Sequence, residues 1–193
     1  MASDTQAPPP GHRRAFGIRV AGLAIIALGA CAALLPAGKS ISSDILGAML
    51  IAAGLVEVIA GSLRGDVRPY AMAAGIVTAI AGLLFVLNPE THFFPTVLPI
   101  VGWLFVRSLI LIFGSRHTSD SVRRWMSLSA GMDFLLGVLL VAGLSISTLV
   151  ISIFGPTPVM IASFAWVLAA SFVVNGLLLL EVASCERAGA SAG

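Results

Sequence analysis

Six uninterrupted apolar stretches dominate this chain of 193 residues, and each is about as long as a lipid bilayer is thick. A helix needs about 20 mostly apolar residues to cross the hydrocarbon core of a membrane. Short clusters built around glycine and proline separate the stretches and are typical of turns. The predicted spans cover residues 16–36, 43–63, 70–88, 95–114, 126–144 and 158–182.

The composition excludes a water-soluble protein. Hydrophobic residues make up 58% of the sequence, charged residues make up 10%, and the mean hydropathy is +1.03, whereas a globular chain carries about 25% charged residues. Backbone groups in lipid must satisfy one another, so spans are helices or closed barrels. Barrel strands alternate apolar and polar residues, and these stretches do not. We therefore expect an all-α polytopic membrane protein with six transmembrane helices.

The basic residues predict the orientation of the spans, because cytoplasmic loops carry an excess of lysine and arginine. One side of the predicted topology carries eight arginines, and the opposite side carries only Lys39. Both termini are therefore expected in the cytoplasm. Residues 1–12 and 188–193 are predicted to be disordered tails around a single transmembrane domain, residues 13–187. The eight arginines are Arg13, Arg14, Arg64, Arg68, Arg116, Arg123, Arg124 and Arg187.

A repeated spacing of small residues predicts three helical hairpins, at residues 16–63, 70–114 and 126–182. Two glycines and a proline, seven residues apart in the first span, recur 53 residues later (22 to 75) in the third span. The fifth span holds a fainter copy. Each hairpin would start and end on the same side, so the repeats would run parallel, unlike the inverted repeats of many secondary transporters. The repeated residues are Gly22, Gly29 and Pro36, then Gly75, Gly82 and Pro89, then Ala130 and Gly137.

Small residues at seven-residue intervals form a stripe on one helix face, where the backbone of a neighbouring helix can come close. In lipid, such packing supplies the drive for helices to associate. We interpret the glycines as packing seams, and the alternative is a glycine-lined pore or lipid groove. The predicted packing glycines are Gly22, Gly29, Gly47, Gly54, Gly61, Gly75, Gly82, Gly114 and Gly137.

Three charged residues, Glu57, Arg107 and Asp133, lie well inside the predicted spans. A charge at the bilayer centre costs about 2.5–3.5 kcal/mol on insertion scales, so an unpaired one facing lipid is disfavoured. The repeat register places all three at a similar depth, and a guanidinium suits two carboxylates. We expect a structural ion network in which Arg107 bridges the two acids. A proton-responsive site and an ion path are the alternatives.

The chain resembles the HdeD family of small bacterial inner-membrane proteins, built on the short repeat of unknown function DUF308, over residues 13–187. The resemblance rests on the hairpin pattern, the basic N-terminal residues, an arginine late in the fourth span and an aspartate in the fifth. It implies a bacterial inner (plasma) membrane location and an acid- or stress-protection role. In the sixth span the family pattern leads us to expect a central acidic residue, where this chain has Asn175, followed later by Glu181. Asn175 is therefore a further candidate partner of the network. The two motifs are Phe105-Val106-Arg107-Ser108-Leu109 and Gly131-Met132-Asp133-Phe134-Leu135.

The N-terminus permits a second interpretation. Arg13-Arg14-Ala15-Phe16 has some likeness to a twin-arginine export signal, and Leu28-Gly29-Ala30-Cys31 to a lipoprotein cleavage site. Either form of processing would remove the first span and leave five.

The sequence predicts no enzyme. It lacks a His-Glu-x-x-His helix, a Gly-x-Ser-x-Gly elbow and a phosphate-binding loop, and its cysteines and histidines do not cluster at metal-ligand spacing. We expect no cofactor, no metal and no nucleic-acid partner. Membrane lipid is the expected partner, with a second copy of the chain or a membrane partner protein left open. The alternative function is a small proton-linked transporter or channel that uses Glu57, Arg107 and Asp133. A water-filled cavity reaching them would favour it, whereas a dry, packed centre would favour a structural role.

Overall fold

Six helices account for all the regular secondary structure in the part of the chain that the structure, a computed structural model, describes. Each of them contains a stretch long and apolar enough to cross a membrane, so the chain is an all-α, multi-pass membrane protein. The described residues are 10–34, 43–65, 67–87, 97–118, 120–154 and 160–191. The helices are α1 (Pro10–Ala33), α2 (Ser43–Ser62), α3 (Arg68–Leu87), α4 (Val97–Ser115), α5 (Asp120–Phe154) and α6 (Met160–Ser191).

Some residues used in the sequence interpretation lie outside the described ranges. They include Pro36 and Pro89 of the repeat, Lys39 of the loop between the first two predicted spans, and residues 1–9 of the predicted N-terminal tail. The arrangement as three repeated hairpins therefore remains a prediction.

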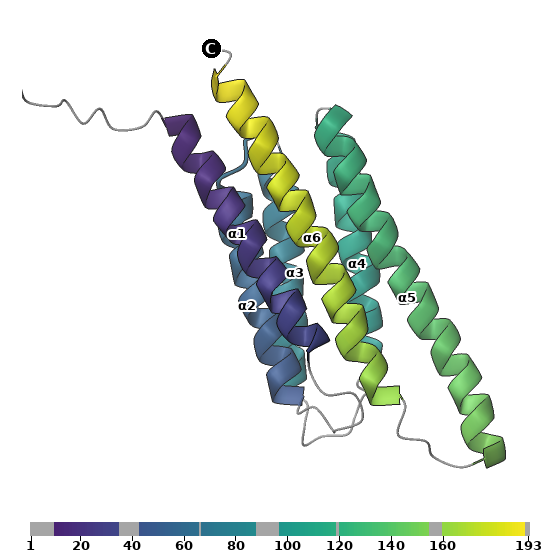
Figure 1. Cartoon of the computed structure of the whole chain (residues 1–193). Coiled ribbons are helices and arrows are strands. Elements are labelled where there is room, and N and C mark those ends of the chain that lie inside the picture. Colours follow the sequence, from purple (N-terminus) through teal and green to yellow (C-terminus); the bar gives the residue numbers. More distant parts are fainter. Residues whose placement is uncertain are drawn as a thin grey trace, which may run out of the picture.

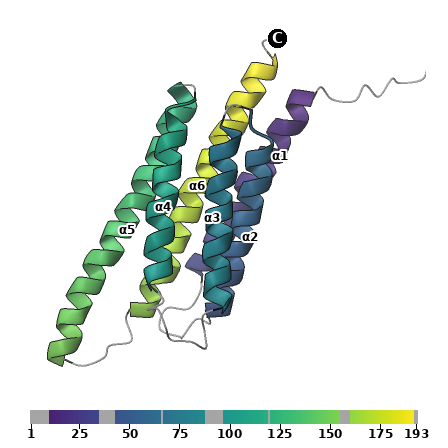
Figure 2. The same ribbon diagram turned by 180° about the vertical axis from the view of Figure 1, so that it is seen from behind.

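Helix α5 extends well beyond the predicted span 126–144, because the first strong helix breakers after it, Gly155 and Pro156, come only after Phe154. Its 35 residues correspond to about 50 Å, more than the ~30 Å hydrocarbon core. The far end of α5 accordingly projects past the other helices (Figures 1 and 2).

Two helices also reach into the predicted disordered tails. Helix α1 begins at Pro10, a residue whose fixed φ suits the first helical position. Helix α6 continues to Ser191, so residues 188–191 are helical. Alanine has the highest helix propensity, and Ala188 and Ala190 extend the helix where the loss of hydropathy had indicated its end.

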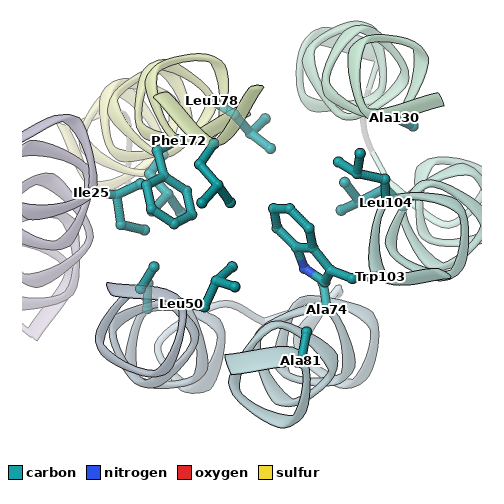
Figure 3. Packing of buried hydrophobic residues seen from close by; sticks show 14 of the residues in the cluster. Ile25, Leu50, Ala74, Ala81, Trp103, Leu104, Ala130, Phe172 and Leu178 are labelled. Atoms are coloured by element: carbon teal, nitrogen blue, oxygen red, sulfur yellow. The ribbon is translucent and has the colours of Figure 1, made fainter. Parts of the chain in front are cut away.

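The helices form a closed ring in which each packs beside its neighbours in the chain and α1 closes the ring against α6. Figure 3 is a close view of this ring in which the helices are seen roughly end-on. The most extensive packing joins α2 to α3, α1 to α6 and α4 to α5. These are pairs from different predicted hairpins. The two helices within each predicted hairpin pack less extensively, so membership of one predicted hairpin does not determine which helices pack most closely.

Apolar side chains fill the middle of the ring. Ile25, Leu50, Trp103, Phe172 and Leu178 are buried there and come from four different helices. The outer faces expose large apolar side chains as well, and monomeric soluble proteins rarely show apolar surface on that scale. This outward surface therefore fits a lipid environment. It includes Leu55, Ile59, Ile76, Ile80, Leu83, Leu109, Phe113 and Leu139.

The glycines of α2 face the backbone of α3 across a very short gap. A Cβ atom built at Gly54 would lie 2.4 Å from Ala79 N and 2.7 Å from Gly75 O. One built at Gly47 would lie 2.8 Å from Gly82 O. Real Cβ atoms do not approach backbone this closely, so only glycine permits this α2–α3 distance.

The other predicted packing glycines also lie at helix contacts. On α1, a Cβ at Gly22 would meet Gly176 O at 3.0 Å and one at Gly29 would meet Ala169 O at 3.1 Å, so α1 and α6 share a second seam. Gly176, near the matching end of the repeat in the sixth span, was not among the predicted packing glycines. In contrast, Gly102 and Gly131 have nothing within 4 Å of a Cβ. The remaining contacts join Gly61 to Ala71, Gly114 to Tyr70 and Met126, and Gly137 to Phe105.

Candidate functional site

A buried guanidinium between two buried carboxylates forms the polar centre of the ring. Arg107 of α4 is 1% exposed. Its Nη2 atom donates to Glu57 Oε1 of α2 at 2.9 Å, and its Nη1 atom donates to Asp133 Oδ2 of α5 at 2.5 Å. The structure thus brings together the three intramembrane charges singled out in the sequence and ties three helices to one side chain.

Helix α6 completes this centre with two polar side chains. The Asn175 amide donates to Glu57 Oε1. The Ser171 hydroxyl donates to Asp133 Oδ1 at 2.7 Å, and Ser171 Oγ also accepts a long hydrogen bond of 3.4 Å from Arg107 Nη1. Ser171 and Asn175 are four residues apart, so they share one helix face. Each acid therefore receives one hydrogen bond from Arg107 and one from α6.

A second polar chain reaches the network from α3 and α4. The Trp103 indole donates to Thr78 Oγ1 at 2.9 Å. The Thr78 hydroxyl donates to Ala74 O at 2.9 Å and also lies 3.4 Å from Glu57 Oε2. The Arg107 guanidinium lies 5.9 Å from the centre of the Trp103 ring, within the range of a cation–π interaction. Five helices thus contribute to the site.

Sequence reasoning missed Ser171, Thr78 and Trp103. The signal that could have found them is general: polar groups within transmembrane helices face the bundle interior and seek partners there. We applied this rule to ionised side chains only. Applied also to hydroxyl and indole groups, it would have identified all three, although it could not have assigned their partners.

A second guanidinium lies near the network. Arg64, which the sequence analysis placed in a cytoplasmic loop, is only 5% exposed. Together with Glu57, Arg107 and Asn175 it lines a cavity of about 20 Å³. With Arg64 included, the two buried carboxylates are matched by two buried guanidinium groups. Arg64 is therefore a second buried guanidinium at the edge of this cavity, although the salt bridges of Glu57 and Asp133 are made with Arg107.

The network connects helices to one another through its two carboxylates. Within the part of the chain described, no group of three or more His, Cys, Asp or Glu side chains is arranged to hold a metal ion. The carboxylates of Glu57 and Asp133 are both engaged by protein donors. The cavity beside them has room for about one water molecule. This arrangement is suited to stabilising the buried charges of Glu57, Arg107 and Asp133 through their salt bridges.

The fold and this centre define a multi-pass membrane protein with a buried ionic network. Residues 73–142 match the family model of a short repeat of unknown function, DUF308. The matched segment covers most of α3, all of α4 and the larger part of α5, and it contains both Arg107 and Asp133. This supports a relationship to the DUF308 short-repeat family. No curated protein and no solved structure matches the chain.

Proposed function

We propose that this protein is a non-catalytic protein of the bacterial inner membrane, of the HdeD type, that contributes to protection against acid or related stress. The observation that carries the proposal is the Glu57–Arg107–Asp133 network. It ties α2, α4 and α5 together at the centre of the membrane domain, with α6 bound through Ser171 and Asn175. A bundle locked in this way is suited to remain folded when the surroundings change.

The distribution of arginines supports cytoplasmic termini for this proposal. The beginning of α1 and the end of α6 lie at the same end of the bundle (Figure 1). Because the helices alternate in direction, the eight arginines counted in the sequence belong to this end too. Seven of these arginines are exposed, and the eighth, Arg64, is buried. An excess of arginine on one side is the feature that orients spans toward the cytoplasm.

Growth at low pH tests the proposal directly. A strain lacking the protein should survive acid exposure less well than its parent, and the wild-type protein supplied in trans should restore survival. The variant Arg107→Met should not restore it, because it leaves two buried carboxylates without their cation. The variant Arg124→Met removes an exposed arginine and should behave as wild type. Survival is counted as colonies, and membrane levels of each variant are measured by immunoblot. Equal acid survival of the deletion strain and its parent would refute the acid role.

The alternative, a small proton-linked transporter or channel, draws its support from the polar lining of the cavity beside Glu57 and Arg107. That cavity is about 20 Å³, which is the space of about one water molecule and is not a continuous path. We therefore expect purified protein in liposomes to give no proton flux above that of empty liposomes under an imposed pH gradient. A pH-sensitive dye inside the vesicles reports the flux. A flux that disappears in Glu57→Gln but persists in the exposed-site variant Arg124→Gln would establish the transporter instead.

A further inference from the structure

A groove between α1 and α6 lies outside the charge network and is not used by it. Its volume is about 450 Å³, within the range of about 300–1,000 Å³ that is typical of small-molecule sites. Arg19 and Leu23 of α1 form one wall, and Leu180, Ser184 and Arg187 of α6 form the other. The two helices lie side by side along this part of the bundle (Figures 1 and 2).

Two exposed arginines, one from each helix, give the groove its charge. Among the residues that the structure describes, no acidic side chain lines the groove. In that part of the chain, neither Arg19 nor Arg187 forms a salt bridge. Arg19 lies within the apolar stretch that starts at Arg13, about 9 Å further along the helix axis. A guanidinium at such a depth requires an anionic partner or access to the headgroup region. Guanidinium groups bind phosphate oxygens through paired, charge-assisted hydrogen bonds.

Apart from Ser184, whose hydroxyl donates to Leu180 O of its own helix, the rest of the groove is apolar. Leu23 lies one turn deeper than Arg19 and is 52% exposed, and Ala183 and Leu180 form the α6 side. The close seam at Gly22, where an added Cβ would lie 3.3 Å from Leu180 Cδ2, brings these two walls together. Apolar walls below a pair of guanidinium groups match a molecule with an anionic head and a hydrocarbon chain. A free phosphate ion has no hydrocarbon part that could contact these apolar walls.

We propose that the α1–α6 groove is a binding site for an anionic phospholipid, with the headgroup phosphate held by Arg19 and Arg187 and an acyl chain lying against Leu23 and Leu180. Basic pockets between transmembrane helices on the cytoplasmic side are known to bind acidic lipid headgroups. The site would fasten α1 and α6, the first and last helices of the ring, to the same lipid.

Native mass spectrometry of the full-length protein in a neutral detergent tests the site. Phosphatidylglycerol and phosphatidylcholine with identical acyl chains are added in separate titrations. The wild-type protein should retain one phosphatidylglycerol about tenfold more strongly than phosphatidylcholine, as expected for charge-assisted contacts to a phosphate that lacks a choline cation. This comparison uses no variant, so it holds even where a variant folds poorly.

A double variant and a matched control locate the binding. Arg19→Gln with Arg187→Gln should lower retention of phosphatidylglycerol about tenfold. Arg116→Gln with Arg124→Gln removes the same charge from the same end of the bundle and should leave retention unchanged. Equal retention of the two lipids, or an equal loss in both double variants, would overturn the proposal. Displacement of the lipid by millimolar inorganic phosphate would also overturn it and would identify a site for soluble anions.

Discussion

Replacing Arg107 by methionine is expected to destabilise the folded bundle by about 3–5 kcal/mol, the cost of leaving buried ionic partners without their counter-charge. Glu57 and Asp133 would then lie together in a space that excludes water, since their burial comes from the packed ring rather than from Arg107 alone. Methionine fills much of the volume of the arginine stem, so the loss would reflect charge more than a cavity. Thermal unfolding in detergent, followed by circular dichroism, measures the effect.

The same experiment has a restoring variant that separates charge from packing. Buried ion networks replaced as a whole by neutral residues are often as stable as the original. The triple variant Glu57→Gln, Arg107→Met, Asp133→Asn should therefore recover most of the stability that Arg107→Met loses. Arg124→Met, at an exposed position, provides the control and should unfold as the wild type does. A triple variant less stable than Arg107→Met alone would show that the ionic form itself is required. An Arg107→Met variant as stable as the wild type would show that the network does not stabilise the folded bundle.

The network could be anticipated from the sequence because the physics involved is strict. Few charges are tolerated in a membrane span, so Glu57, Arg107 and Asp133 stood out, and the repeat register gave them a common depth. The burial of Arg64 could not be anticipated in the same way. Its place beside a helix end made it a loop residue by sequence, and only the packing of the ring shows that its side chain is enclosed.

The order and pairing of helices depend on information that hydropathy does not contain. The spans were located within a few residues for α2, α3 and α4, since glycine and proline mark their ends. The extension of α5 to Phe154 was missed because the residues after 144 are less apolar yet contain no helix breaker. The pairing of α2 with α3 and of α1 with α6 arises from which glycine faces meet. A repeat of glycines along one helix does not specify the partner.

Substitution of Gly54 by leucine is expected to prevent α2 and α3 from packing at their present distance and to abolish the folded state. Even the Cβ atom alone would lie 2.4 Å from Ala79 N and 2.7 Å from Gly75 O. Both are backbone atoms of α3 and cannot rotate away, so the helices themselves must separate. Gly54→Ala should therefore cost about 1–3 kcal/mol as an overpacked core does, despite the gain of about 1 kcal/mol in helix propensity over glycine. The yield of monodisperse protein and its melting temperature measure both effects.

Gly131 supplies the matched test of whether contact, rather than loss of glycine as such, causes the effect. It lies on α5, with nothing within 4 Å of an added Cβ, and its neighbours Leu128 and Leu135 are exposed on the outer face. Gly131→Leu and Gly131→Ala should leave the protein folded and at least as stable as wild type, because each gains helix propensity without meeting another helix. If Gly54 and Gly131 tolerated leucine equally well, α2 and α3 could not be as close as a glycine seam requires, and helix packing would have to be attributed to other contacts.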